Sequence, residues 1–206
     1  MYPHIKRGLD FILSLSALIV LSPVMLILTL AVRLSSPGPA FFRQKRVGRG
    51  KTHFTIYKFR TMRTDAPKDA PTHLLKNPQS YITPVGRFLR ASSLDELPQL
   101  FNILKGDMAI VGPRPALWNQ YDLIAARDEV HANDVLPGLT GWAQVNGRDE
   151  LPIDVKARLD GEYVRRMSFL FDLRCILATV RSVLRRDGVR EGAREETGKR
   201  GDDTVA

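Results

Sequence analysis

Residues 11–32, a run of 22 residues without one ionisable side chain, constrain the fold of this 206-residue chain more than any other feature. A straight α-helix needs about 20 such residues to cross the hydrocarbon layer of a bilayer. Lys6 and Arg7 precede the run, as in a secretory signal, but the apolar part of such a signal spans only about 7–15 residues. The run is therefore predicted to be a retained membrane helix.

Two features of this segment argue against a simple crossing. Pro23 lies near its middle and removes the backbone donor to the carbonyl of residue 19, so a kink is expected there. Ser22 can return its hydroxyl to the freed carbonyl, which allows the bend to persist in lipid. Basic residues flank both sides, which favours two cytoplasmic ends. Each leg spans only roughly 17 Å, so the pattern fits a re-entrant hairpin in one leaflet as well as a spanning helix.

The distribution of charge and the cysteine count exclude several classes of protein. The net charge is +9, but residues 1–63 carry +10 and residues 64–206 carry −1. Because the basic charge is confined to the apolar end, we expect no nucleic-acid partner. The single Cys175 excludes a disulfide framework and a cysteine-based zinc site. The sequence carries no signal for an oligomeric state.

The rest of the chain is predicted to be a small α+β domain, mostly helical. Short strands are expected at residues 40–42 and 53–57, with a basic turn between them, and a Gly-rich loop at 137–148. Helices are expected at residues 93–104, 117–131, 153–167 and 169–186. The last of these is amphipathic, and its apolar face favours burial against the core over a membrane surface. Residues 64–80 are typical of a polar surface loop and residues 187–206 of a solvated tail. We therefore expect a membrane segment at 1–34, a domain at 35–186 and a tail at 187–206.

Asp95 and Glu96 form the most suggestive pair of side chains. Ser93 and Glu96 have the spacing of a capping box, in which both acids merely stabilise the N-terminus of a helix. The alternative is chemistry, because adjacent side chains on a helix diverge by about 100°. One carboxylate could then attack phosphorus while its neighbour holds a magnesium ion. The helix dipole would keep both carboxylates ionised at neutral pH.

Cations suited to phosphate accompany this pair along the chain. They are Lys58, Arg60, Arg90, Arg114 and Arg148. Arginine forks match the oxygens of phosphate, although each of these residues taken singly is also an ordinary surface cation. Arg114 is notable because a proline on either side holds it on a stiff backbone.

Trp142 could stack on a base, pack in the core or lie at a membrane interface. The Gly-rich motifs of nucleotide-hydrolysing and dinucleotide-binding proteins are missing from the sequence.

Five strings occur in the order found in a family of bacterial sugar transferases, the small monotopic phosphoglycosyl transferases. They are FFRQKRVGR, YKFRTM, GRFLRASSLDELPQLFNILKGDM, VGPRP and PGLTGWAQVNGR. The resemblance covers about residues 6–186 and implies transfer of a sugar-1-phosphate from a UDP-sugar to a polyprenol phosphate such as undecaprenyl phosphate. It also implies release of UMP and a requirement for Mg²⁺.

The same resemblance implies a placement in the membrane. Its helix–break–helix bends at a Ser-Pro pair that matches Ser22 and Pro23, so the hairpin is expected rather than the spanning helix. The hairpin would pack on a small cytoplasmic domain whose amphipathic helices rest on the phospholipid surface. The protein is thus expected at the cytoplasmic face of the bacterial inner membrane.

Carried over position by position, the resemblance makes Asp95 the nucleophile of a phosphosugar intermediate and Glu96 a metal ligand. Arg90 and Arg114 would bind phosphate. The tail loosely resembles that of enzymes that use N,N′-diacetylbacillosamine, whereas residues 151–153 depart from the Ser-Trp pair of relatives. The competing interpretation is a membrane-tethered adaptor whose basic N-terminal belt binds anionic lipid. Such an adaptor needs neither the acid pair nor Arg114.

Overall fold

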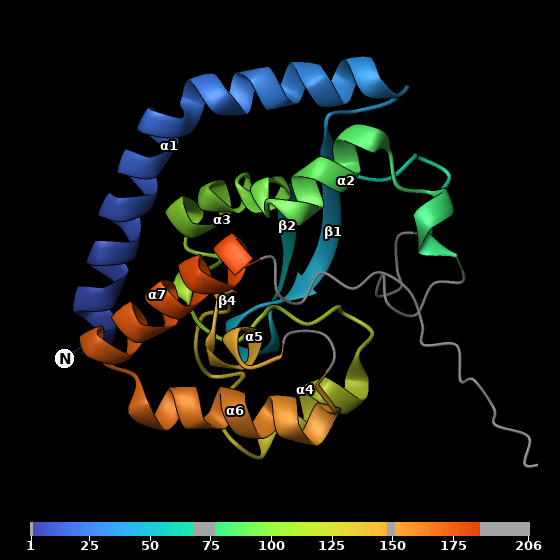
Figure 1. Cartoon of the computed structure of the whole chain (residues 1–206). Coiled ribbons are helices and arrows are strands. Elements are labelled where there is room, and N and C mark those ends of the chain that lie inside the picture. The colour runs from blue at the N-terminus through green and yellow to red at the C-terminus, as the bar shows by residue number, and fades with distance from the viewer. Residues whose placement is uncertain (1, 68–76, 148–150, 186–206) are drawn as a thin grey trace, which may run out of the picture.

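The computed structural model of the chain describes residues 2–67, 77–147 and 151–185. In this part of the chain the long helix α1 (Tyr2–Ser35) runs along the outside of a domain built from short helices and two small sheets (Figure 1). The remaining elements, with η for a 3₁₀ helix, are β1 (Phe41–Val47), η1 (Arg49–Lys51), β2 (His53–Phe59), η3 (Pro78–Ser80), α2 (Pro84–Ala91), η4 (Leu94–Glu96), α3 (Gln99–Lys105), β3 (Ala109–Val111), α4 (Tyr121–Asp128), β4 (Gly138–Thr140), α5 (Trp142–Val145), α6 (Ile153–Arg166) and α7 (Phe169–Arg185). The predicted α+β, mostly helical class is confirmed.

Helix α1 contains Pro23 and changes direction part-way along its length (Figure 1). The helix is nevertheless continuous from Tyr2 to Ser35, so the expected interruption is a bend within one helix. Ser22 Oγ donates to the carbonyl of Ile19 at 2.8 Å. This is the carbonyl that Pro23, which has no N–H, leaves without its helical donor. The predicted contact of the Ser22 hydroxyl is therefore confirmed.

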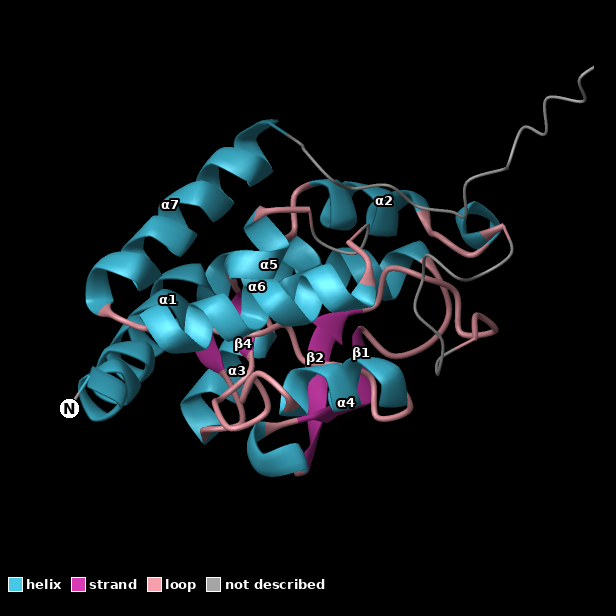
Figure 2. Cartoon of the chain, turned by 90° about the horizontal axis from the view of Figure 1, so that it is seen from below, coloured by secondary structure: helices cyan, strands magenta, loops and turns pink. Residues whose placement is uncertain are grey.

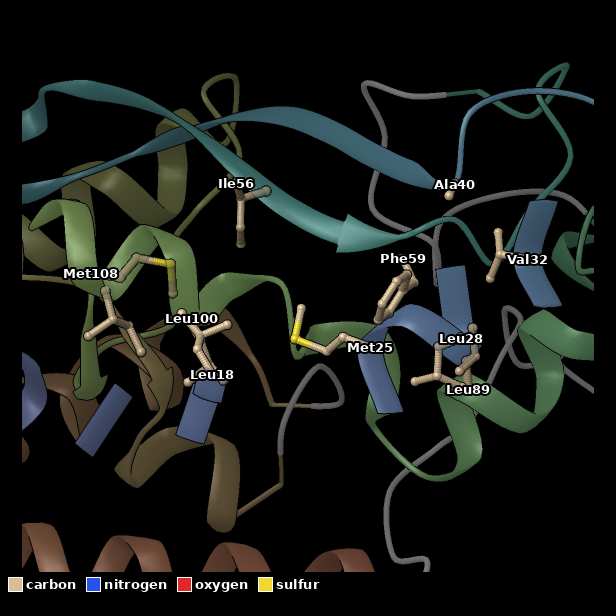
Figure 3. Close-up of a cluster of buried hydrophobic side chains, with 11 residues drawn as sticks. Leu18, Met25, Leu28, Val32, Ala40, Ile56, Phe59, Leu89, Leu100 and Met108 are labelled. Carbon is tan, nitrogen blue, oxygen red and sulfur yellow. The ribbon is translucent and has the colours of Figure 1, made fainter. Parts of the chain in front are cut away.

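The two sides of α1 have different surroundings. Leu18, Met25, Leu28 and Val32 enter a core that also contains Phe59 of β2 (Figure 3). The opposite side exposes large aliphatic side chains, among them Val20, which is 73% exposed. Among the described helices, α1 is the one that is long and apolar enough to cross a membrane. Its outer side is thus suited to lipid, because such a surface is unfavourable in water.

Strands β1 and β2 form an antiparallel hairpin whose register runs from Phe41 opposite Phe59 to Val47 opposite His53. Both strands are longer than predicted: Arg43, Lys45 and Arg46, which were expected in the turn, continue β1. The turn itself is the short η1, in which Gly50 has a φ of 62° that favours glycine. Strands β3 and β4 pair in parallel and form the second sheet.

The helices match the sequence-based expectation unevenly. Helices α6 and α7 lie where they were predicted, with bounds that differ by at most one residue at their ends. The helix expected at 117–131 is limited to α4, and the loop expected at 137–148 contains β4 and α5. The start of α7 lies beside the start of α1, where Tyr2 and Lys6 contact Asp172, and α6 crosses the lower side of the domain in Figure 1 and its centre in Figure 2. Most of the predicted 64–80 loop and the whole 187–206 tail lie outside the described residues.

Candidate active site

Asp95 and Glu96 lie in η4, a single 3₁₀ turn between α2 and α3. The predicted helix at 93–104 is therefore divided. Ser93 adopts a left-handed backbone with φ 57°, and Pro98 cannot donate to the carbonyl of Leu94, which accepts from Leu97 N instead. Within the described residues Ser93 makes no side-chain capping bond, so the capping box expected from the spacing is wrong.

Glu96 is held by cations from two separate parts of the chain. Lys58 Nζ, from β2, lies 2.7 Å from Glu96 Oε1, and Arg114 Nη2, from the loop after β3, lies 3.1 Å from the same oxygen. The Glu96 side chain is only 19% exposed. Burial alone would raise the pKa of Glu96, but Lys58 and Arg114 outweigh it and hold this pKa well below its usual range. Glu96 is therefore ionised throughout the physiological range.

Asp95 is in a different electrostatic state from its neighbour. Burial raises the pKa of Asp95 to about 6, against the opposing effect of Lys58 and with a further rise from the charge of Glu96. Arg90 and Arg114 also lower it. The expectation that both carboxylates are ionised at neutral pH holds, but a helix dipole is not the cause for Asp95, because η4 is a single turn and burial raises this pKa. Asp95 is mostly ionised at neutral pH and poorly solvated, which are favourable properties in a nucleophile.

Arg90 reaches this pair from the end of α2. Its Nε donates to Thr61 Oγ1 at 2.8 Å, so a threonine that the sequence analysis did not single out orients the guanidinium. Helix α2 can approach Thr61 because position 86 is glycine; a Cβ at Gly86 would lie 2.0 Å from the carbonyl oxygen of Thr61. Thr83 caps this helix by accepting from Gly86 N at 2.9 Å.

Four predicted phosphate or metal ligands thus gather around Asp95, and two others differ. Lys58, Arg90, Glu96 and Arg114 are brought together by β2, α2, η4 and the loop after β3. Arg60 is buried elsewhere, where it donates to the carbonyls of Val32, Ser36 and Pro37 at the end of α1. Both of its terminal nitrogens are used by these carbonyls, so Arg60 does not join the cluster around Asp95. Arg148 lies outside the described residues.

Trp142 packs on α6 and α7. Its Nε1 donates to Glu162 Oε2 at 2.9 Å, and the centroid of its ring lies 5.1 Å from the centroid of the Phe171 ring. Arg174 Cζ lies over the Trp142 ring, 5.0 Å from its centroid. Of the three roles considered from the sequence, packing against neighbouring helices is the one that these contacts support.

The cluster fits a magnesium ion only together with a phosphate ligand. Among the described residues no group of three or more His, Cys, Asp or Glu could hold a metal. Mg²⁺ is commonly held by one or two carboxylates plus substrate phosphates. Glu96 is the ionised carboxylate of the cluster that would hold such an ion, and both of its cation contacts are made through Oε1.

Comparison with known proteins identifies the family to which this arrangement belongs. A model of the family described as bacterial sugar transferase matches residues 1–186. The chain belongs to the bacterial sugar transferase family and is therefore a transferase. It is 41% identical over 187 residues to the uncharacterized sugar transferase EpsL of Bacillus subtilis, covering 91% of each chain.

Other relatives have names that specify their substrates. The chain is 44% identical over 182 residues to the UDP-glucose:undecaprenyl-phosphate glucose-1-phosphate transferase of Xanthomonas campestris pv. campestris, covering 85% of this chain and 38% of that protein. It is 36% identical over 197 residues to the UDP-N-acetylgalactosamine-undecaprenyl-phosphate N-acetylgalactosaminephosphotransferase of Aeromonas hydrophila, covering 92% of this chain and 46% of that protein. The chain thus spans less than half the length of these two relatives.

Proposed function

We propose that this protein transfers a sugar-1-phosphate from a UDP-sugar to undecaprenyl phosphate, as the first membrane step of glycoconjugate assembly. The observation that carries the proposal is the convergence of Asp95 and Glu96 with Lys58, Arg90 and Arg114. The named relatives act on a UDP-sugar and undecaprenyl phosphate, which supports the same substrate classes here. A membrane-tethered adaptor would not need a half-buried acid pair surrounded by cations.

The proposed reaction has two displacements at one phosphorus. An oxygen of the Asp95 carboxylate bonds to the phosphorus that carries the sugar, and the bond to the bridging diphosphate oxygen breaks, so UMP leaves with the electron pair. An oxygen of undecaprenyl phosphate then bonds to the same phosphorus, and the electron pair of the broken bond returns to Asp95. Because UMP leaves before the lipid phosphate enters, fewer anions must be neutralised at one time.

The other side chains of the cluster offset charge and fix position. Arg90 and Arg114 are placed to hold phosphate oxygens, since guanidinium groups match them in geometry and charge. Lys58 keeps Glu96 ionised and oriented through their 2.7 Å contact. Glu96 would hold Mg²⁺, which when bound withdraws negative charge from the diphosphate. These groups act where charge develops as the carboxylate approaches phosphorus.

The test uses the full chain reconstituted in nanodiscs with undecaprenyl phosphate. A panel of UDP-sugars that includes glucose, galactose, N-acetylgalactosamine and N,N′-diacetylbacillosamine derivatives is screened for UMP release with and without Mg²⁺. We expect one donor to release UMP, and the resemblance of the tail favours the N-acetylated amino sugars. If lipid and Mg²⁺ are present and no UDP-sugar releases UMP, the proposal is wrong.

The fold supports the proposal that α1 is re-entrant, because both of its ends are attached to the same domain. At the start, Lys6 Nζ lies 2.8 Å from Asp172 Oδ2 of α7, and Arg7 donates to the carbonyls of Ile103 and Leu104 at the end of α3. At the other end, Arg60 donates to the carbonyls of residues 32, 36 and 37. A straight spanning helix would place its two ends on opposite sides of the bilayer.

Cysteine labelling in intact cells tests this topology. His4→Cys and Pro39→Cys introduce thiols at exposed positions on either side of the apolar segment, whereas the native Cys175 is buried. We expect both positions to resist a membrane-impermeant reagent until the membrane is opened. Lys51→Cys, on the exposed turn of the β1–β2 hairpin, reports the side of the domain. Labelling of either test position from outside would exclude the re-entrant arrangement.

The pKa of Asp95 predicts an unusual pH dependence. A carboxylate at its ordinary pKa of 3.8 would leave activity constant down to about pH 5, whereas burial raises this pKa to about 6. Only the ionised form can attack phosphorus, so kcat/KM should fall as the pH decreases through about 6. The measurement is a pH profile of kcat/KM with saturating Mg²⁺. If kcat/KM stays constant down to pH 5 and falls only below it, the assignment of Asp95 as the nucleophile with a raised pKa is wrong.

A further inference from the structure

The loop that carries Arg114 is held by its main-chain carbonyls. Pro113 O accepts from Gly138 N at 2.8 Å, Arg114 O from Arg127 Nη1 at 2.9 Å, and Pro115 O from Arg46 Nη1 at 2.9 Å. Both prolines lack an N–H, so this stretch can form few main-chain bonds of its own. Three consecutive carbonyls therefore take donors from three different parts of the chain.

The donor to the middle carbonyl is half of a buried ion pair. Arg127 of α4 is 3% exposed and Asp160 of α6 is 1% exposed. Arg127 Nε and Nη2 donate to Asp160 Oδ2 at 2.8 and 2.6 Å, which fixes the plane of the guanidinium. Its remaining Nη1 then points to the carbonyl of Arg114. The guanidinium thus connects two helices to the residue whose side chain contacts Glu96.

We infer that Arg127 and Asp160 are positioning residues for Arg114, which hold its main chain so that its guanidinium meets Glu96 and the substrate phosphate. This inference rests on the proposed function only for the role of Arg114. A buried guanidinium needs acceptors for its remaining N–H groups, and here the acceptor for Nη1 is the carbonyl of the one arginine that this loop contributes to the site. A shift of about 1 Å at a distance from the chemistry can lower a rate about a hundredfold.

The variant that tests this inference removes both charges together. A single substitution would leave an unpaired buried charge, whereas replacing a buried ion pair by apolar residues of similar size is often neutral for stability. Arg127→Met/Asp160→Leu is therefore the test variant. The matched control is Lys51→Met/Asp128→Leu, which removes an exposed 2.9 Å ion pair that also involves α4. Arg127→Lys replaces the test variant if that variant does not fold.

The measurement is a double-mutant cycle with Arg114→Met. In the wild-type background, Arg127→Met/Asp160→Leu should lower kcat/KM for the UDP-sugar by about a hundredfold. In the Arg114→Met background the same change should cost no more than about twofold, because its effect passes through Arg114. The control variant should retain wild-type kcat/KM. Losses of equal size in the two backgrounds would show a role unrelated to Arg114 and overturn the inference.

A crystal structure of the test variant decides the matter without any assay of transfer. The contact between Arg114 Nη2 and Glu96 Oε1, 3.1 Å in the wild-type chain, should be lost. If this contact persists in the test variant, the inference is wrong, whether or not the wild-type enzyme transfers sugar phosphate. If it is lost while the wild-type chain releases no UMP from any UDP-sugar, the positioning stands and the proposed function fails.

Discussion

Replacing Asp95 by Asn should lower turnover by at least about 10³-fold and, at neutral pH, raise the unfolding temperature. The amide has the shape of the carboxylate but cannot displace UMP from phosphorus. Stability should change in the other direction, because burial raises the pKa of Asp95 to about 6 and thus makes its ionised form costly in the folded state. A gain of about 1 kcal/mol would raise the unfolding temperature by roughly 2–4 °C.

The pH dependence of this stability gain has a definite sign. The folded-state pKa of Asp95 lies above its unfolded value of 3.8, so the native protein gains stability as the pH falls from above 6 towards 4. At neutral pH the full cost of the buried charge is present, and the amide removes it. Near pH 4 wild-type Asp95 is protonated in the folded state, so the gain should disappear.

The measurement combines intact mass, UMP release and thermal unfolding. Wild-type enzyme incubated with UDP-sugar and Mg²⁺ alone should acquire a phosphosugar on the peptide that contains Asp95, and Asp95→Asn should not. Asp107→Asn is the matched control, because Asp107 forms a 3.1 Å ion pair with Lys105 away from this cluster. Activity above a few per cent in Asp95→Asn, or UMP release only after addition of lipid with no adduct, would exclude the covalent route.

The elements that were predicted well are those with a clear local pattern. Helices α6 and α7 have apolar residues at helical spacing. A proline within a helix predicts a kink, and Pro23 is such a proline. The 3₁₀ turn η4, which carries Asp95 and Glu96, does not follow from the sequence. The spacing of apolar residues shows neither the left-handed backbone of Ser93 nor the effect of Pro98 on hydrogen bonding. The predicted first strand ends at residue 42, too early, because Arg43, Lys45 and Arg46 give the rest of β1 the basic composition of a turn.

For the candidate site, the sequence predicts which residue types could bind phosphate but not which of them come into contact. The sequence indicates which cations suit phosphate, and Lys58, Arg90 and Arg114 do gather near Asp95. Arg60 has the same chemistry but its donors are used by carbonyls at the end of α1, a contact that depends on how α1 packs. Arg127 lies in a polar helix without a local motif. Its role depends on Asp160 and Arg114, which only the tertiary fold brings to it.

Replacing Glu96 by Gln should have a large effect of the opposite sign on stability. Burial opposes the charge of Glu96, but Lys58 and Arg114 outweigh it, so the folded-state pKa lies below the unfolded value. This contribution to stability is present at neutral pH and is lost as the pH falls through the folded-state pKa. The amide leaves two cations close together without their shared anion, which should cost about 2 kcal/mol. The unfolding temperature should then fall by roughly 4–8 °C.

The same substitution should weaken metal dependence and catalysis together. Glu96→Gln removes the proposed carboxylate ligand of Mg²⁺, so the metal concentration for half-maximal activity should rise at least about tenfold. With saturating metal, kcat should remain about 10²-fold below wild type, because Lys58 and Arg114 lose the anion that orients them. Glu162→Gln is the matched control, since Glu162 contacts Trp142 and Arg166, which are not part of the Asp95 cluster. An unchanged Mg²⁺ dependence with a reduced kcat would make Glu96 an orienting anion for Lys58 and Arg114 and exclude it as the metal ligand.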